Sequence, residues 1–432
     1  MFAAGEESSQ KGRSTEVVVR AITALTPGDE EDFPDGGLRA WLVVIGCFVV
    51  NAVTVGFCFV SIWGVFHAYY AEGILAGTSP STLSLLGSIP GGLMTILSVV
   101  TGKLADRYQY KPMIGIGCIL WVSTMLGIAF STKLWHFMLT QGVMQGMAGG
   151  FIFPICSAFP SQWFHQKRAF STGVVLSGSS FGAAVTSAII RVMLSYFGLR
   201  KTMLIKTGID AIALGAAYLL IKERRKPSTT ITWYDKKYLA DPTFWSITLC
   251  MCLSNFGFPA PFFYLPTFAK QKIPNLTELL SILSVTILNV SSGIGRCCIG
   301  FLADRIGPTN SMFSVVLISG LAQLLIWNFV SDYPGIMAMS VLYGFFGVCF
   351  WSLATPIGAW FYGTENLAGL SGLLFLFTAP GELLGPPITG AIYNVTNSWH
   401  RVIAFSGTVQ VAAAITLLYA RFKRESSVFK VC

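Results

Sequence analysis

The sequence contains little charge for its length. Asp, Glu, Lys and Arg together make up 11% of the 432 residues, whereas a soluble protein normally carries about 25%. Hydrophobic residues make up 53% of the chain, and the mean hydropathy is +0.64. This number of charges is too small to cover a water-facing surface of this size. Much of the surface must therefore face lipid. The composition therefore excludes an ordinary soluble domain.

The patterns of common catalytic and metal sites are also missing. The sequence holds no CxxC pair, no His–Cys cluster, no phosphate-binding loop and no set of nucleophile, base and acid. Nine of the ten cysteines lie in apolar runs, where cysteine is usually a small packing residue. The net charge of +9 comes from short basic clusters between those runs, which does not indicate nucleic-acid binding. We expect no enzyme, no cofactor or metal, and no nucleic-acid partner.

Apolar segments long enough to cross a hydrocarbon core, which takes about 20 residues, occur twelve times. We predict an all-α polytopic membrane protein with twelve transmembrane helices in two six-helix halves. The segments cover residues 41–66, 81–101, 113–131, 135–158, 169–192, 202–221, 243–268, 279–301, 311–330, 334–361, 367–392 and 402–420.

The segments divide the chain into five parts. Residues 1–34 are polar, lack an apolar signal region and are predicted to be a disordered tail. The two halves are predicted at residues 35–221 and 243–421, joined by a linker at 222–242, and residues 422–432 form a second tail.

Lys and Arg are distributed unequally between the two sides of the predicted membrane. Twenty lie on the side of the tails and the linker, and seven lie on the other side. Because basic residues favour the cytoplasm, both termini are predicted to be cytoplasmic, most simply at a plasma membrane. The sequons at Asn275 and Asn394 fall on the outer side, but in short loops close to the membrane, which disfavours glycosylation.

A six-residue pattern occurs once in each half, 198 positions apart. Its glycine lets neighbouring helices approach closely, and its aspartate can accept hydrogen bonds from a helix N-terminus in the other half. Its arginine can pair with acids or carbonyls. We expect a conformational latch on the cytoplasmic side, and the alternative, a tight turn with topology-setting charges, fits two copies in register poorly. The copies are Gly102-Lys-Leu-Ala-Asp106-Arg107 and Gly300-Phe-Leu-Ala-Asp304-Arg305.

This pattern resembles the signature of the major facilitator superfamily. Other stretches are similar to the paired signatures of its monocarboxylate-porter family, in the fungal branch. The resemblance spans residues 34–421 and implies the major facilitator fold, with a small organic solute as partner and no required oligomer. These stretches are Pro34–Trp41, Trp163–Arg168 with Gly173, Ser177–Gly182, Asn289–Arg296 and Gly385–Gly390.

Ionisable residues inside the membrane are the best site candidates, because each is costly there and usually faces the interior. The resemblance implies that Arg296 meets a substrate carboxylate, for which a guanidinium fork is well shaped. Glu382 could carry a coupling proton, or be a structural carboxyl bonded to backbone freed by nearby prolines. Lys206 and Asp210 stand four apart and are predicted to form an ion pair away from the cavity.

Two departures argue against a proton–lactate mechanism. Proton-coupled lactate carriers have a lysine in the first helix, but residues 42–66 contain no charge, and Ser292 replaces an aspartate one turn before Arg296. The presumed cavity helices instead carry polar and aromatic residues, which suit a larger, partly aromatic or neutral solute. Together with Arg296, the predicted substrate-binding residues are Asn51, Gln145, Asn255, Tyr343 and Trp351.

The sequence thus indicates a secondary active transporter that works by alternating access. Its cargo is predicted to be a carboxylate or a secondary metabolite, with a proton as candidate coupling ion and efflux as one direction. A non-transporting nutrient sensor of the same fold, or an uptake carrier for a vitamin-like solute, remains an alternative.

Overall fold

The computed structural model describes residues 33–57, 63, 66, 69–70, 73–78, 80–224, 236–274 and 276–424. All regular structure within these ranges is helical, so the predicted all-α class is confirmed. Most of both tails, most of the linker and Asn275 lie outside the described residues. The chain from Asp35 onward is one compact unit, and the description below concerns that unit.

Ten helices in the described ranges are long and apolar enough to cross a membrane, and two features reconcile them with the expected twelve. The described part of the first span, α2 (Leu38–Val53), has 16 residues and is shorter than that criterion. The 53-residue α8 (Arg168–Leu220) contains two spans, because its backbone turns at Gly198. Gly198 has φ 68° and ψ 175°, a conformation that glycine adopts without steric penalty.

The first half contains three further spans. They are α4 (Pro80–Tyr108), α5 (Tyr110–Ala129) and a stack of α6 (Leu134–Phe137), the π-helical η2 (Met138–Met144), α7 (Gln145–Ala158) and η3 (Phe159–Gln162).

The second half follows the short α9 (Lys236–Leu239). Three of its six spans consist of two α-helices each, and a fourth ends in a 3-10 turn. The spans are α10 (Pro242–Gly257) with α11 (Pro259–Lys272), α12 (Glu278–Ile306), α13 (Pro308–Leu325) with η4 (Trp327–Phe329), α14 (Tyr333–Gly347) with α15 (Cys349–Tyr362), α16 (Leu367–Leu376) with α17 (Ala379–Thr396), and α18 (Trp399–Arg424).

Prolines explain only some of these breaks. Pro259 and Pro380 stand in the first positions of α11 and α17, where a missing N–H costs nothing. Pro154 and Pro386 instead lie inside continuous helices. The break between α14 and α15, at Val348, has no proline beside it.

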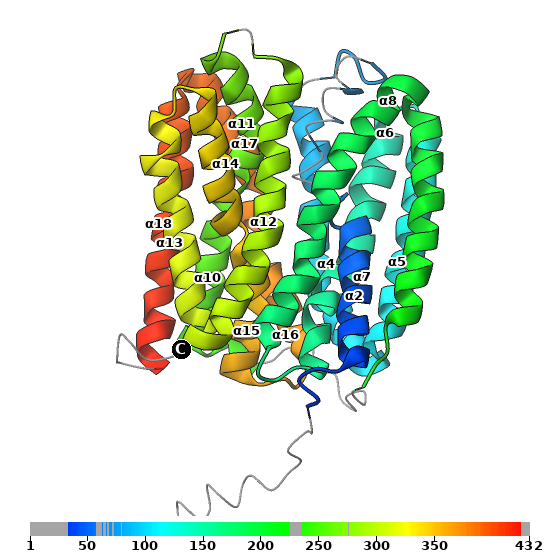
Figure 1. The fold of residues 1–432 in the computed structure, drawn as a ribbon, viewed down its shortest axis with the longest axis vertical. Helices are drawn as coiled ribbons and strands as arrows, with labels where there is room; N and C mark the ends of the chain where they lie inside the picture. Colours follow the sequence, from blue (N-terminus) through cyan, green and yellow to red (C-terminus); the bar gives the residue numbers. More distant parts are fainter. Residues whose placement is uncertain are drawn as a thin grey trace, which may run out of the picture. The chain divides into compact units, whose positions relative to one another are not determined.

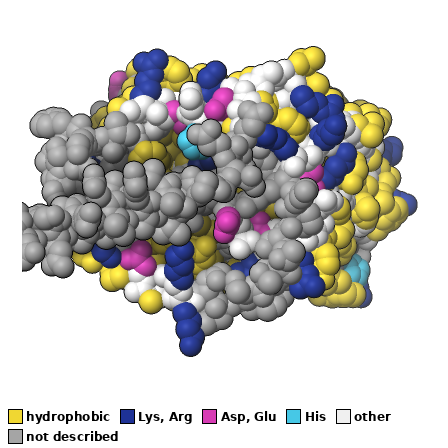
Figure 2. All heavy atoms as spheres, turned by 90° about the horizontal axis from the view of Figure 1, so that it is seen from below, with side chains coloured by type: hydrophobic (Ala, Val, Ile, Leu, Met, Phe, Trp, Pro, Cys, Tyr) yellow, Lys and Arg dark blue, Asp and Glu magenta, His cyan; other side chains and the backbone are white. Residues whose placement is uncertain are grey.

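The helices run side by side, with α12 and α8 adjoining at the boundary between the two halves (Figure 1). We call the end at the bottom of Figure 1 the lower end; it holds the start of α2 and the end of α18. Seen face-on, this end carries many Lys and Arg side chains, while hydrophobic side chains lie toward the flanks (Figure 2). The charge and lipid-facing surfaces are therefore separated as in a membrane protein.

Two backbone-to-backbone crossings join the halves near the lower end. A β-carbon at Gly102 of α4 would clash with the Ala368 carbonyl of α16. A β-carbon at Gly300 of α12 would lie 2.6 Å from the Ala169 carbonyl oxygen of α8. Only glycine permits such close approach, so the motif glycines set the contact between the halves.

Candidate functional site

A central cavity of about 80 Å³ lies between the two halves. Seven of its lining residues are apolar or aromatic and six are polar or charged, a combination that small-molecule sites use for contact and orientation. Both halves contribute residues, which places the cavity where a transporter of two halves binds its cargo. It is lined by Val55, Met94, Phe153, Ser179, Ser180, Phe258, Phe262, Asn289, Ser292, Arg296, Val348, Trp351 and Glu382.

Arg296 projects from α12 into the boundary with α8. Its side chain is buried, and Nη1 donates to the Leu176 carbonyl at 2.7 Å and to Ser179 Oγ at 3.1 Å. Its Nε is buried and has no protein partner. One nitrogen therefore anchors the guanidinium to the other half, while the group remains on the cavity wall.

Two serines meet across the same boundary, one turn from Arg296. Ser292 Oγ of α12 lies 3.0 Å from Ser180 Oγ of α8. Asn289, Ser292 and Arg296 share one face of α12, because residues three and four apart stack on a helix. The sequence already contained this signal, because polar residues at this spacing in an apolar segment indicate the face of the helix that lines a cavity.

Glu382 lies in the first turn of α17 and faces α4 of the other half. The side chain is 8% exposed, and a β-carbon at Gly91 of α4 would lie 2.9 Å from Glu382 Oε1. Its Oε2 is buried and has no protein partner. A structural carboxyl would be expected to accept hydrogen bonds from the protein, so this geometry does not support the structural interpretation.

Aromatic rings form much of the remaining wall. The Trp351 ring of α15 packs edge-on against Phe153 of α7, with centroids 5.4 Å apart, and so joins the two halves. The cavity lining continues through Phe258, at the break between α10 and α11, and Phe262 of α11. Such a surface suits a flat apolar body.

Four residues predicted from the sequence to bind substrate are not among those lining this cavity. Asn51 and Asn255 each donate a hydrogen bond to the carbonyl four residues earlier, at 3.0 Å and 2.8 Å. Gln145 lines a second, much smaller cavity inside the first half. The remaining residue, Tyr343, is fully buried within the second half.

Tyr343 supports the cavity indirectly. Its hydroxyl donates to the Phe258 carbonyl at 3.1 Å, at the break before α11. It also accepts from Gln323 Nε2 of α13 at 3.4 Å and Gln410 Nε2 of α18 at 3.3 Å. Hydrogen bonds from α13, α14 and α18 thus fix the backbone of Phe258, whose ring lines the cavity.

The first motif aspartate, Asp106, crosses from the first half to the second. It accepts from the Gly369 N–H at 2.7 Å and the Ala368 N–H at 3.3 Å, in the first turn of α16. The Tyr110 hydroxyl also donates to Asp106, at 2.8 Å. A carboxylate is favoured at this position, because the helix dipole and the free N–H groups both face it.

The second motif aspartate makes the reciprocal contact. Asp304 of α12 accepts from the Ala169 and Phe170 N–H groups, in the first turn of α8, at 2.8 Å and 2.9 Å. Within the described part of the chain, no ion pair joins either motif arginine to an acid. Arg107 and Arg305 instead lie over aromatic rings of their own helices, 5.4 Å and 4.3 Å from the ring centroids.

The two family-like signatures of the first half touch each other at the lower end. Asp35 accepts from the backbone N–H groups of His165 and Gln166 at 2.6 Å and 2.9 Å. The Trp41 ring packs against Phe164, with centroids 5.2 Å apart. This contact fixes the start of α2 beside the start of α8.

A third polar cluster at the lower end joins the start of α10 to other helices. Asp241 accepts from Tyr362 at 2.9 Å, from Lys423 at 3.0 Å and from the Thr243 N–H at 3.0 Å. Partial burial alone would raise the pKa of Asp241. The hydrogen bonds from Thr243, Lys423 and Tyr362 outweigh that effect and lower the pKa to about 2. The carboxylate is therefore ionised throughout the physiological range.

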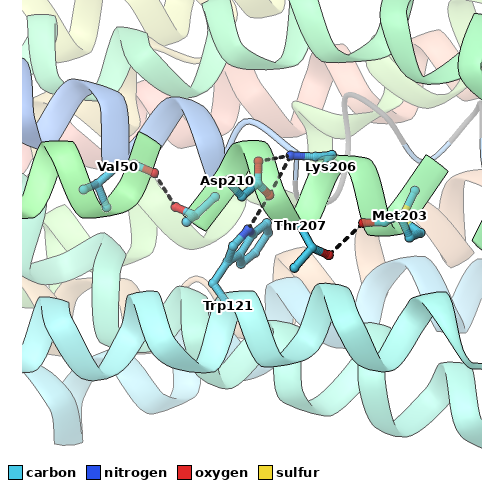
Figure 3. A network of polar contacts seen from close by, with 7 residues as sticks. Val50, Trp121, Met203, Lys206, Thr207 and Asp210 are labelled. Atoms are coloured by element: carbon cyan, nitrogen blue, oxygen red, sulfur yellow. Dashed lines mark hydrogen bonds and ion pairs between the residues drawn. The ribbon is translucent and has the colours of Figure 1, made fainter. Parts of the chain in front are cut away.

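The predicted ion pair in the first half is confirmed, and it lies away from the cavity lining (Figure 3). Lys206 Nζ lies 2.7 Å and 2.8 Å from the two Asp210 oxygens, and the Trp121 indole donates to Asp210 at 3.1 Å. Asn394 is exposed in the last turn of α17.

Comparison with known proteins identifies the family. The sequence matches the Major Facilitator Superfamily over residues 48–295 and 275–430. The chain belongs to the Major Facilitator Superfamily. Its members are transporters, so this protein is an integral membrane transporter and not an enzyme.

Fungal transporters are among its relatives. The chain is 29% identical to the aspyridones efflux protein apdF of Emericella nidulans, over 91% of this chain and 80% of that protein. It is 29% identical to the agnestins efflux protein AgnL12 of Paecilomyces divaricatus, over 89% and 88%.

Solved structures share the fold at low identity. The human organic anion transporter MFSD10 superposes with a TM-score of 0.67 at 15% identity, covering 90% of this chain and 99% of that one. The Escherichia coli fucose:proton symporter FucP gives 0.66 at 16% identity, covering 88% and 98%.

Proposed function

We propose that this transporter is a secondary active exporter of an acidic secondary metabolite, of the monocarboxylate-porter type and its fungal branch. The observation that carries the proposal is Arg296, a buried guanidinium on the wall of a cavity shared by both halves. A guanidinium there can bind a carboxylate or other acidic group of the cargo. Two relatives named as efflux proteins support export as the direction.

The lower end is the cytoplasmic end in this proposal. Its Lys and Arg side chains match the bias of cytoplasmic surfaces, at a plasma membrane with both termini inside (Figure 2). The contacts of Asp106 and Asp304 hold the halves together at that end. Cargo would enter from the cytoplasm when both latches part and leave on the other side, which is alternating access.

Glu382 is the candidate for coupling export to a proton. Its carboxylate lines the same cavity and packs against the opposite half. A proton carried there would link the membrane potential, which supplies about 2.3 kcal/mol per charge per 100 mV, to movement of the cargo.

Export can be tested in a strain from which the gene is deleted. The strain is complemented with wild-type protein or with Arg296→Gln, and small molecules in cells and medium are quantified by mass spectrometry. We expect at least one acidic metabolite to accumulate in cells without the wild-type protein and to return to the medium with it. Identical distributions in all three strains, at equal surface expression, would refute export through Arg296.

A further inference from the structure

Arg296 and Glu382 line one cavity, but no ion pair within 4.0 Å joins them. Each belongs to a different boundary between the halves. Arg296 extends from α12 to α8, whereas Glu382 extends from α17 to Gly91 of α4. The cavity therefore holds two groups of opposite formal charge that do not neutralise each other by direct contact.

Each group also keeps a buried atom without a protein partner. Arg296 Nε is an unused donor, and Glu382 Oε2 is an unused acceptor. A buried polar atom without a partner costs free energy, and a charged one costs more. A cargo molecule that supplies both partners would relieve both costs when it enters.

Aromatic groups share the cavity wall with these two positions. Phe153 and Trp351 pack edge-on at 5.4 Å, and Phe258 and Phe262 continue the wall. In this conformation the cavity measures about 80 Å³, so it must widen when the halves part to admit a drug-sized molecule. A short monocarboxylate would satisfy Arg296 and leave Glu382 Oε2 without a partner.

We infer that the cargo is amphoteric. It carries an acidic group bound by Arg296, a flat apolar body and, away from the acid, a hydrogen-bond donor bound by Glu382. The donor is a hydroxyl, an amide N–H or an ammonium group. The inference rests on the proposed function and deepens it, because it makes Glu382 a specificity-determining residue for the class of solute.

The test uses a matched set of probes and the purified full-length protein. The first probe is a biphenyl carboxylic acid with a hydroxyl on the far ring; the second is its methyl ether, which cannot donate. Affinities are measured by titration calorimetry at one fixed pH, without a gradient. Wild-type protein should bind the hydroxy acid about ten- to a hundredfold more tightly, as for one hydrogen bond to a charged group.

Variants assign the preference to its residue. Glu382→Leu should bind the two probes equally, whereas Glu382→Gln should keep part of the preference, because its amide oxygen still accepts. Arg296→Gln should weaken both probes by the same factor. Glu365→Gln, the same change at an exposed loop position, should match wild type. Size-exclusion profiles identify any variant that fails to fold.

The outcomes separate this inference from the proposed function. Equal affinity of wild type for the two probes, no binding of either, or a preference that survives in Glu382→Leu would overturn the inference. Export in the complemented strain without donor preference in binding would overturn the inference alone. Donor preference without any export would overturn the proposed function alone.

Discussion

Asp106→Asn should loosen the lower end while leaving the fold intact. In the structure the carboxylate receives two backbone N–H groups from the start of α16 and the Tyr110 hydroxyl. Asparagine offers one carbonyl oxygen and no charge. At least one backbone N–H therefore loses its bond to residue 106, although the Ala368 N–H can still donate to the Tyr110 hydroxyl at 3.2 Å. The remaining bonds lose the assistance of the negative charge.

The size of the effect follows from these contacts. Loss of a hydrogen bond to a charged group, at a helix N-terminus, costs about 1–3 kcal/mol. This cost falls on the closed state, because Gly369 and Asp106 belong to different halves and separate when the end opens. A change of this size shifts the ratio of closed to open protein by about 5- to 150-fold.

The assay measures access to a buried position between the halves. Ser157 of α7 is fully buried and bonds to Thr355 of α15 at 3.1 Å. In a cysteine-reduced protein, Ser157→Cys should react faster with a thiol reagent applied to the cytoplasmic side when Asp106→Asn is added. Asp332→Asn, at the start of α14 with no side-chain cap bond, serves as the matched control.

Equal reaction rates with and without Asp106→Asn, in protein that remains folded, would show that the contact stabilises both states equally. A contact of that kind cannot bias a conformational equilibrium. Asp106 would then be a turn residue, and the latch interpretation would be wrong.

Four further changes test the site and its support. Arg296→Gln should abolish export at unchanged surface expression, and Arg296→Lys should restore little, because an ammonium lacks the planar fork; normal export by either would make Arg296 structural. Glu382→Gln should remove accumulation driven by a pH gradient in proteoliposomes while keeping solute exchange, and retained accumulation would end the proton hypothesis. Tyr343→Phe should lower the free energy of unfolding by about 1–3 kcal/mol, because the Phe258 carbonyl and the two glutamines lose a buried partner; Tyr196→Phe, at an exposed position, is its control in thermal unfolding. Asp241 has a lowered pKa, so its contribution is present above about pH 4 and is lost only as the pH falls toward 2. The loss of melting temperature in Asp241→Asn should therefore be equal at pH 5 and pH 7, and a smaller loss at pH 5 would contradict this.

The spans and the charged candidates could be predicted from the sequence, because a membrane requires long apolar segments and makes a charge within one of them rare. A charge such as Arg296 or Glu382 stands out in an apolar segment, and the structure places both on the central cavity. The repeated motif also predicted helix N-termini as partners of Asp106 and Asp304. It could not identify those partners, since Gly369 lies 263 positions from Asp106 and carries no side chain that signals a contact.

The polar lining was predicted less well. Asn51, Gln145, Asn255 and Tyr343 stand on helices that surround the centre, but these helices are apolar all round, so no period indicates which face meets the cavity. A buried polar group can equally bond within its own half, as Tyr343 does. The breaks that bring Phe258 and Val348 to the cavity depend on tertiary packing that local propensity does not determine.

The crossings at Gly102 and Gly300 also affect where selectivity can reside. When the lower end parts, the surfaces that separate at these two crossings include bare main chain, with carbonyl groups of Ala368 and Ala169 facing glycine. At these two crossings, few side chains are available to bind a passing molecule or to exclude one by its shape. Selection among molecules would then fall mainly to the centre, where Arg296 and Glu382 line the cavity.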